Sequence, residues 1–265
     1  DKGPSRARVA PNEMRRYYAR EAESLRQEVR AFLAEEIETG TFTPYPTARG
    51  SEFNREFSRR VGARGWIGMT WPRQYGGHER SALERYVVLE EALIAGAPVS
   101  AHWIADRQSG PLLLRFGSEQ QRRKILPGIA RGELVFCIGM SEPDSGSDLA
   151  SLRSSAKRTD DGWILNGAKV WTTNAGEADF MIGLFRTATD PDNRHGGLSQ
   201  FLIDMNTPGI TIEPIITIAG DHEVNQVFLD DVRVPIANRV GPENDGWTVA
   251  KYLLEFERGG DARAA

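Results

Sequence analysis

The hydrophobic pattern of the chain changes near residue 134, and this change limits the folds that the chain can adopt. Before it, apolar residues recur at spacings of three and four, which predicts helices with one buried face. The clearest series is Leu25, Val29, Phe32, Leu33 and Ile37. After it, short apolar segments alternate with clusters of Gly, Pro, Asn and Asp, which predicts strands. We therefore expect an α+β protein, helical first and β-rich second.

Residues 1–133 are expected to form an all-α N-terminal helical domain. Asn12, Pro98 and Ser118 are typical residues for the start of a helix. The turn-rich segment 65–77 separates the second helix from the third. The predicted helices cover residues 12–37, 52–63, 83–94, 98–116 and 118–125.

Residues 134–240 are expected to form a small antiparallel β-barrel domain. The turn Asp161-Gly162 joins two short segments, at 154–159 and 163–166, which predicts a β-hairpin. No helix-length segment separates the later strands, so a barrel or sandwich is favoured over a parallel sheet. Those strands are predicted at 169–173, 180–186, 198–204, 210–216 and 226–234.

Residues 241–265 are expected to be a linker and the first helix of a C-terminal helical bundle, starting near Gly246. The helical spacing places Glu257 within the apolar sector and Glu255 opposite it, beside Lys251. A buried carboxylate loses hydration, so its pKa rises and it accepts protons better when ionised. Alternatively, Glu257 pairs with an arginine such as Arg258 or reaches solvent. The sector consists of Val249, Ala250, Leu253, Leu254 and Phe256.

Composition argues against several classes of protein. The 33 basic and 37 acidic residues give a net charge of −4, which disfavours a nucleic-acid partner. The longest apolar run, 134–140, is too short for membrane insertion, and the N-terminus lacks a secretory signal. The single cysteine, Cys137, predicts an unreactive core thiol and a cytoplasmic protein. No metal site is expected, because no ligand-like spacing connects His78, His102, His195 and His222.

Two segments carry side chains suited to a polar ligand. Residues 141–148 are rich in hydroxyls and carboxylates and offer free donors; the alternative, which is the more common case, is a solvated loop that caps the next element. Residues 169–174 place Trp171 and Thr173 on one face of a strand, which suits a planar heterocycle; alternatively, the tryptophan belongs to the core. The acidic strand end at 228–235 is interpreted as structural. The chain has no GxGxxG, phosphate-loop or GxSxG motif.

The order of the motifs resembles the acyl-CoA dehydrogenase family, in particular its bacterial members. The resemblance extends from about Asn12 to Arg258. It implies a helical domain, a β-domain with FAD packed against it, and a C-terminal helical bundle that is missing here. The bundle completes the FAD adenine site and the oligomer core in that family. The motifs are GWIGMTWPRQYGG at 65–77, FGSEQQRRKILPGIARGE at 116–133, MSEPDSGSD at 140–148, GAKVWTTNA at 167–175, and the segments 229–235 and 241–247.

The resemblance also implies roles for individual residues. Met140 and Ser141 are expected to contact the pyrimidine end of the isoalloxazine, and Ser147 the FAD phosphates or the pantetheine of acyl-CoA. Trp171 is expected to lie against the ring, with Thr173 hydrogen-bonding near N5. The implied reaction removes the α-proton of an acyl-CoA thioester and transfers the β-hydride to N5, which gives the trans-2-enoyl-CoA.

Most members of that family carry the catalytic glutamate in the C-terminal domain. Isovaleryl- and long-chain-type members place it on the first helix after the middle domain, directly before an arginine. Glu257 matches that position, which implies that Glu257 is the base and that Arg258 tunes it or positions the acyl-CoA. The resemblance further implies electron-transfer flavoprotein as acceptor and a homo-oligomer (dimer or tetramer) or heteromer. The alternatives are a non-catalytic partner subunit of a heteromer, or a flavin oxidase or monooxygenase, including nitroalkane oxidation.

Overall fold

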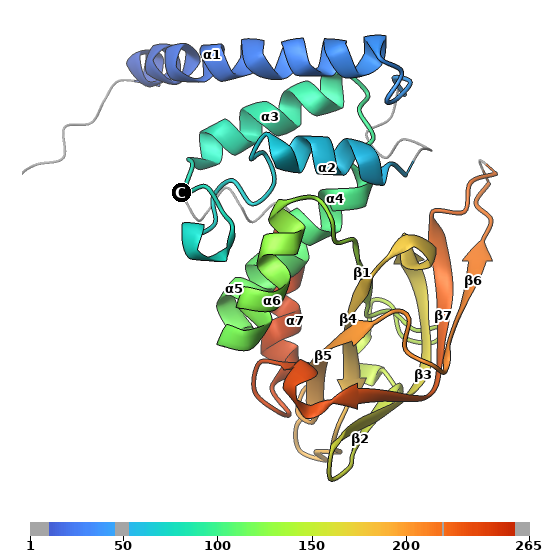
Figure 1. The fold of residues 1–265 in the computed structure, drawn as a ribbon. Helices are drawn as coiled ribbons and strands as arrows, with labels where there is room; N and C mark the ends of the chain where they lie inside the picture. The colour runs from blue at the N-terminus through green and yellow to red at the C-terminus, as the bar shows by residue number, and fades with distance from the viewer. Residues whose placement is uncertain (1–10, 46–52, 219, 258–265) are drawn as a thin grey trace, which may run out of the picture.

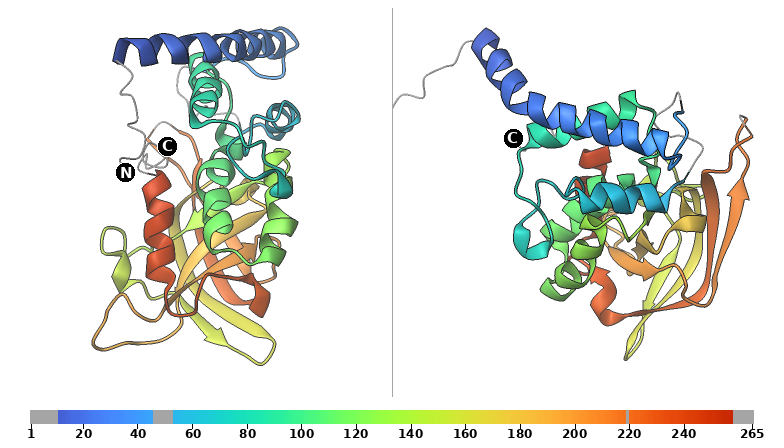
Figure 2. Two further views of the ribbon diagram at one scale, coloured as in Figure 1. Left: turned by 90° about the vertical axis from the view of Figure 1, so that its left-hand side faces the viewer. Right: turned by 45° about the horizontal axis from the view of Figure 1, so that its top comes forward.

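The computed structural model describes residues 11–45, 53–218 and 220–257, with side chains from residue 22 onward. The first half is helical, as the apolar spacing predicts (Figure 1). Helix α1 lies across α3, at the end of the molecule away from the sheet (Figures 1 and 2). The helices are α1 (Pro11–Glu38), α2 (Arg55–Ala63), α3 (Ala82–Ile94), α4 (Ser100–Ile104), α5 (Gly110–Phe116) and α6 (Glu119–Ala130).

Polar caps set the starts of three of these helices. Ser81 and Ser118 each accept the backbone N–H three residues on, and the acidic or amide side chain there accepts the serine's own N–H. Such a capping box satisfies N–H groups that the first helical turn leaves unpaired. Asn54 caps α2 through the N–H of Phe57 at 2.8 Å, so this helix begins at Arg55 and not at residue 52.

The helix expected at 98–116 is interrupted in its middle. A π-helical turn, Ala105–Ser109, joins α4 directly to α5. A π-helical turn inserts an additional residue into the helix, and such turns are frequent at functional sites. Here the turn contributes Arg107 and Gln108 to a cavity beside the sheet.

The second half forms one sheet of eight strands. β2 and β3 form the predicted hairpin, and the two strands expected at 163–166 and 169–173 are one long strand, β3. The strands follow the order β6-β7-β3-β2-β4-β5-β8, with β1 beside β4. Their bounds are β1 (Phe136–Gly139), β2 (Ser155–Arg158), β3 (Gly162–Thr173), β4 (Phe180–Arg186), β5 (Leu198–Asp204), β6 (Ile210–Ile215), β7 (Val224–Pro235) and β8 (Arg239–Val240).

The expectation of a closed antiparallel barrel is wrong in two respects. Among the described residues, the path of strands ends at β6 and β8 and does not close. The sheet is also mixed, because β4 pairs in parallel with β1 and, between Arg186 and Ser155, with β2. Turn residues predict the pairing of strands that are neighbours in the sequence. They carry no information about the non-local pairing of β1 with β4, which makes the sheet mixed.

The two faces of the sheet belong to different hydrophobic cores. Met181 and Phe185 of β4 lie in a core enclosed by strands, whereas Ile182 and Leu184 lie in a core shared with the helices. This alternation follows from the two-residue period of a strand. Cys137 is buried in the first of these cores, as predicted, and burial raises the pKa of its thiol.

The last helix, α7 (Gly246–Glu257), runs along the same side of the sheet as α5 (Figures 1 and 2). Val249, Ala250 and Leu253 are fully buried and anchor it in the core shared with the helices. It contacts α5, the π-helical turn, β4 and β5. The helix expected from Gly246 is therefore confirmed, whereas the domain boundaries 1–133, 134–240 and 241–265 stay a prediction.

Candidate functional site

A cavity of about 330 Å³ lies where the helices meet the sheet. Its helical side comes from α4 and the π-helical turn, and its sheet side from β1 and the end of β3. Glu257, the last residue of α7, also faces it. The lining residues are Val99, Ser100, Trp103, Ile104, Arg107, Gln108, Ile138, Thr173, Asn174, Glu223 and Glu257.

Two residues predicted from the sequence, Glu257 and Thr173, share this cavity although 84 positions separate them. The burial expected for Glu257 is wrong, because its residue is exposed in the structure. The first turns of α7 are anchored in the core, whereas in the last turn Leu254 and Phe256 are only half-buried. Glu257 therefore lines the cavity without being enclosed by packed side chains. Arg258 lies outside the described residues.

A hydrogen-bonded corner fixes the end of β3 against the helices. Asn174 adopts a left-handed backbone conformation, with φ of 58°. Its side-chain amide donates to the Ser100 hydroxyl at 2.8 Å, and its backbone N–H donates to the Glu223 carbonyl at 2.7 Å. These bonds join α4, β3 and the start of β7, and so they determine where Thr173 enters the cavity.

Trp171 is unusually exposed for a large residue in a strand, with 62% of its surface accessible. The pairing of β3 with β7 is interrupted between Lys169 and Thr172, and Trp171 there has φ of 59°. A bulge of this kind redirects a side chain, and a positive φ is unusual for a bulky residue. Thr172 is fully buried, so the strand presents Trp171 outward from its interior.

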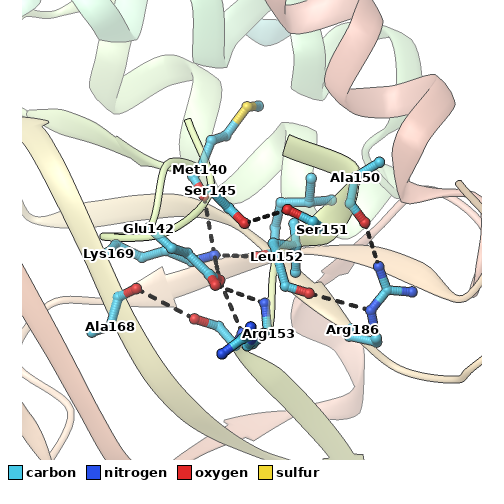
Figure 3. Close-up of polar contacts among 12 residues, drawn as sticks. Met140, Glu142, Ser145, Ala150, Ser151, Leu152, Arg153, Ala168, Lys169 and Arg186 are labelled. Atoms are coloured by element: carbon cyan, nitrogen blue, oxygen red, sulfur yellow. Dashed lines mark hydrogen bonds and ion pairs between the residues drawn. The ribbon is translucent and has the colours of Figure 1, made fainter. Parts of the chain in front are cut away.

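The loop from Met140 to Ser154 connects β1 to β2, and two cationic side chains donate hydrogen bonds to it (Figure 3). Arg186 donates to the carbonyls of Ala150 at 2.8 Å and Leu152 at 3.3 Å. The second cation, Lys169, holds the beginning of the loop. At the far side of the loop, Ser147 is exposed.

Lys169 is fully buried, and three acceptors surround its ammonium (Figure 3). Nζ donates to the Leu184 carbonyl at 2.7 Å, to the Glu142 carboxylate at 2.9 Å and to the Met140 carbonyl at 3.2 Å. Burial lowers the pKa of Lys169 to about 8, against the opposing effect of Glu142.

Glu142 itself is 7% exposed. Its carboxylate accepts the backbone N–H groups of Arg153 at 2.6 Å and Ser154 at 2.9 Å. Burial raises the pKa of this carboxyl, but the Lys169 charge and the N–H donors outweigh burial and hold the pKa below its usual value.

The predicted site residues therefore fall into two groups. Thr173 and Glu257 line the cavity, whereas Met140, Ser141 and Ser147 lie on the loop beyond β1, and Trp171 lies at the bulge. Met140 is buried, and the Ser141 carbonyl accepts the Val170 N–H of β3 at 2.9 Å. Backbone bonding thus places the loop beside the strand that carries Trp171 and Thr173.

Comparison with known protein families identifies the chain. Residues 19–133 match the family model "Acyl-CoA dehydrogenase, N-terminal domain", and residues 137–232 match "Acyl-CoA dehydrogenase, middle domain". The chain belongs to the acyl-CoA dehydrogenase family. Members of this family are flavin-dependent oxidoreductases.

Individual acyl-CoA dehydrogenases resemble the chain over most of its length. Acyl-CoA dehydrogenase FadE26 of Mycobacterium tuberculosis is 36% identical over 251 residues, which are 92% of this chain and 62% of FadE26. The chain therefore spans less than two thirds of that relative.

Solved structures of acyl-CoA dehydrogenases have the same fold. The Tcur3481-Tcur3483 steroid ACAD is 36% identical with a TM-score of 0.77, over 90% of this chain and 62% of that chain. A chain of the ChsE4-ChsE5 complex from Mycobacterium tuberculosis is 35% identical with a TM-score of 0.76, over 95% of this chain and 61% of its own length.

Several residues of the candidate site were not predicted from the sequence. Arg107 and Gln108 face the cavity because of the π-helical turn, which leaves no clear signal in the sequence. The sequence does carry a signal for Lys169 and Glu142. Both lie within the motifs at 140–148 and 167–175, and a lysine is unusual within an apolar strand. Asn174 ends the segment 169–174, but its hydrogen bond to Ser100 depends on the tertiary structure.

Within residues 11–45, 53–218 and 220–257, no helix is long and apolar enough to cross a membrane. In the same ranges, no three His, Cys, Asp or Glu side chains gather as a metal site requires.

Proposed function

We propose that the full protein oxidises an acyl-CoA thioester to the trans-2-enoyl-CoA, with FAD as cofactor and Glu257 as base. The observation that carries this proposal is the shared cavity of Glu257 and Thr173, which joins a carboxylate from the last helix to a hydroxyl at the end of β3. Membership of a flavin-dependent family supports the choice of cofactor.

The residues present fit a flavin. The bulge in β3 exposes the flat ring of Trp171, which offers a planar heterocycle an aromatic surface. Thr173, two residues further along the chain, lines the cavity, where its hydroxyl is able to donate to a ring nitrogen such as N5. Met140 and Ser141 would hold the pyrimidine end, and the exposed Ser147 would bind the FAD phosphates or the pantetheine of acyl-CoA.

Bound FAD would accept the β-hydride of the acyl chain. The protein's own part is to remove the α-proton, and Glu257 is suited to it because it lines the cavity with a carboxylate side chain. A positioned general base contributes roughly 10²- to 10⁴-fold to the rate. Arg258, which follows Glu257 directly in the sequence, would tune the base or position the thioester.

The assignment is tested with Glu257→Gln in the full-length protein loaded with FAD. Anaerobic bleaching of the flavin absorbance by a panel of acyl-CoAs should slow by about 10²- to 10⁴-fold, while FAD binding stays unchanged. Glu255→Gln is the matched control, because Glu255 is an exposed glutamate of the same helix that does not line the cavity. Unchanged bleaching in Glu257→Gln would contradict the assignment of the base.

The wild-type protein decides between the main proposal and its alternative. If no acyl-CoA bleaches its bound flavin, the chain is better explained as a non-catalytic partner subunit. The names of the Tcur3481-Tcur3483 and ChsE4-ChsE5 structures, which pair two components each, favour this alternative enough to test it. We further propose that electron-transfer flavoprotein reoxidises the enzyme, that the full protein is a homo-oligomer or heteromer, and that it is cytoplasmic.

A further inference from the structure

Lys169 is the most deeply buried charge among the side chains that the structure describes, and the proposed reaction does not use it. Its ammonium has three protons, and the carbonyls of Leu184 and Met140 and the carboxylate of Glu142 provide three acceptors. The aromatic ring of Phe185 lies 4.8 Å from Nζ. The ammonium is therefore held in one position, with its hydrogen bonds satisfied (Figure 3).

This position connects two elements that are distant in the sequence. Lys169 belongs to β3, whereas Met140 and Glu142 belong to the loop after β1. The neighbouring Val170 N–H donates to the Ser141 carbonyl at 2.9 Å. Three consecutive loop residues, Met140, Ser141 and Glu142, are thus bound by two consecutive strand residues.

Glu142 extends the connection to the other end of the loop. Its carboxylate accepts the N–H groups of Arg153 and Ser154, at 2.6 and 2.9 Å, just before β2 begins. The Lys169–Glu142 pair therefore closes the loop at both ends and fixes the loop against β3. Without the lysine, the carboxylate would be buried with backbone donors alone.

Fold stability alone does not explain such a pair. A buried ion pair loses so much hydration that apolar residues of similar volume are often equally stabilising or better. Such a pair instead fixes the local structure, because its donors and acceptors are all satisfied in one arrangement only. Here the ion pair fixes the position of Met140 and Ser141 on the loop relative to Trp171 and Thr173 on the strand.

We propose that Lys169 is a positioning residue for the flavin, which sets the loop at Met140 and Ser141 relative to the strand that carries Trp171 and Thr173. The proposal rests on the proposed function, since it takes these residues as contacts of FAD. Lys169 itself touches neither cofactor nor substrate. It acts through the Met140 carbonyl and through Glu142.

The first test needs no flavin. Lys169→Met in the full-length apoprotein should accelerate amide hydrogen exchange of Val170, Arg153 and Ser154 by about tenfold or more, because their acceptors lose a fixed position. Arg55→Met is the matched control. Arg55 also forms an ion pair between distant elements, because it joins α2 to Asp179 at 3.0 Å, but it does not contact the loop. This control should leave the three amides unchanged.

The second test uses FAD as the probe. Lys169→Met should weaken FAD binding by about tenfold or more and shift the absorption spectrum and reduction potential of the flavin that remains bound, whereas Arg55→Met should change none of them. Faster exchange with unchanged FAD affinity, spectrum and potential would overturn the positioning role. A wild-type protein that binds no FAD would overturn the proposed function as well, which distinguishes the two failures.

A double variant keeps the test valid if Lys169→Met does not fold. Lys169→Met with Glu142→Gln removes both charges and retains an acceptor for the loop N–H groups, so thermal stability should recover. The proposal expects FAD affinity to stay at least about tenfold below that of the wild type, because the Met140 carbonyl still lacks its donor. Recovery of stability and FAD affinity together would show a purely structural pair and overturn the proposal.

Discussion

Two buried glutamates, one in the helical half and one at the sheet, hold similar charges in different ways. Glu91 of α3 is 3% exposed and binds Arg26 and Arg30 of α1, the latter at 2.7 Å. Glu142 is buried to a similar degree but binds a lysine that has no exposed surface. The pKa of each carboxyl lies below its usual value, in Glu91 chiefly because Arg30 donates to it.

The difference lies in the access of the partner cation to water. The Arg30 side chain is 51% exposed and that of Arg26 22%, so both guanidinium groups can turn to solvent if the carboxylate is removed. Lys169 cannot do so without opening the sheet. We therefore expect Glu91 to contribute modestly to the stability of the helices, and Glu142 to be necessary for the local structure of the loop.

The largest expected effect comes from replacing Glu142 by leucine, with the same replacement at Glu91 as the comparison. Glu142→Leu leaves the Lys169 ammonium without a counter-charge and the N–H groups of Arg153 and Ser154 without an acceptor. We expect the free energy of unfolding to fall by about 3–5 kcal/mol. Glu91→Leu should lower it by about 1 kcal/mol or less.

Urea denaturation of both variants, at matched pH, measures this difference. A similar loss for the two variants would contradict the role that we give to solvent access. An unchanged m-value in each variant is the control, because it shows that the unfolded state has not altered.

The parts of the structure that the sequence predicts are those that depend on local interactions. Helices and strands follow from local patterns, and the caps at Ser118 and the turn at Asp161-Gly162 are local signals. The bulge at Trp171 is not local. A regular two-residue alternation places Lys169, Trp171 and Thr173 on one face, but the structure buries the lysine and exposes the tryptophan.

The candidate site shows a similar limit. The helical spacing of α7 predicts Glu257 within the apolar sector, and in the structure Glu257 lines the cavity with Thr173. The spacing could not show how far the last turn of α7 is buried, and among the described residues Glu257 is exposed, so the expected burial was wrong. Burial depends on what packs against a helix, which is a property of the tertiary structure.

His102 tests whether a group's access to water determines its effect on stability, independently of whether the group lies among the helices or at the sheet. Its imidazole Nδ1 lies 2.7 Å from the Ser58 hydroxyl, and burial lowers its pKa to about 4. The unfolded chain binds a proton near pH 6.5 and the folded protein only near pH 4, so stability falls as the pH drops through this window. By about pH 5 the loss from this group should reach about 2 kcal/mol.

His102→Asn removes the titrating ring and retains a side chain able to hydrogen-bond Ser58. The difference in unfolding free energy between about pH 7.5 and pH 5 should be smaller in this variant by about 2 kcal/mol. Equal pH dependence in the variant and the wild type would show that the ring of His102 is as accessible to water as the arginines around Glu91.

The smallest effect is expected at Arg26. Arg26→Met removes one of the two cations bound to Glu91, but Arg30 stays in place with bonds of 2.7 and 3.1 Å. The free energy of unfolding should fall by at most about 1 kcal/mol, and the difference should shrink further in about 1 M salt, which screens partly exposed pairs. The destabilisation by Lys169→Met should persist in the same salt, because the buried pair is screened much less. Urea denaturation at low and high salt measures both, and an equal salt response would show that water reaches Lys169 as it reaches Arg26.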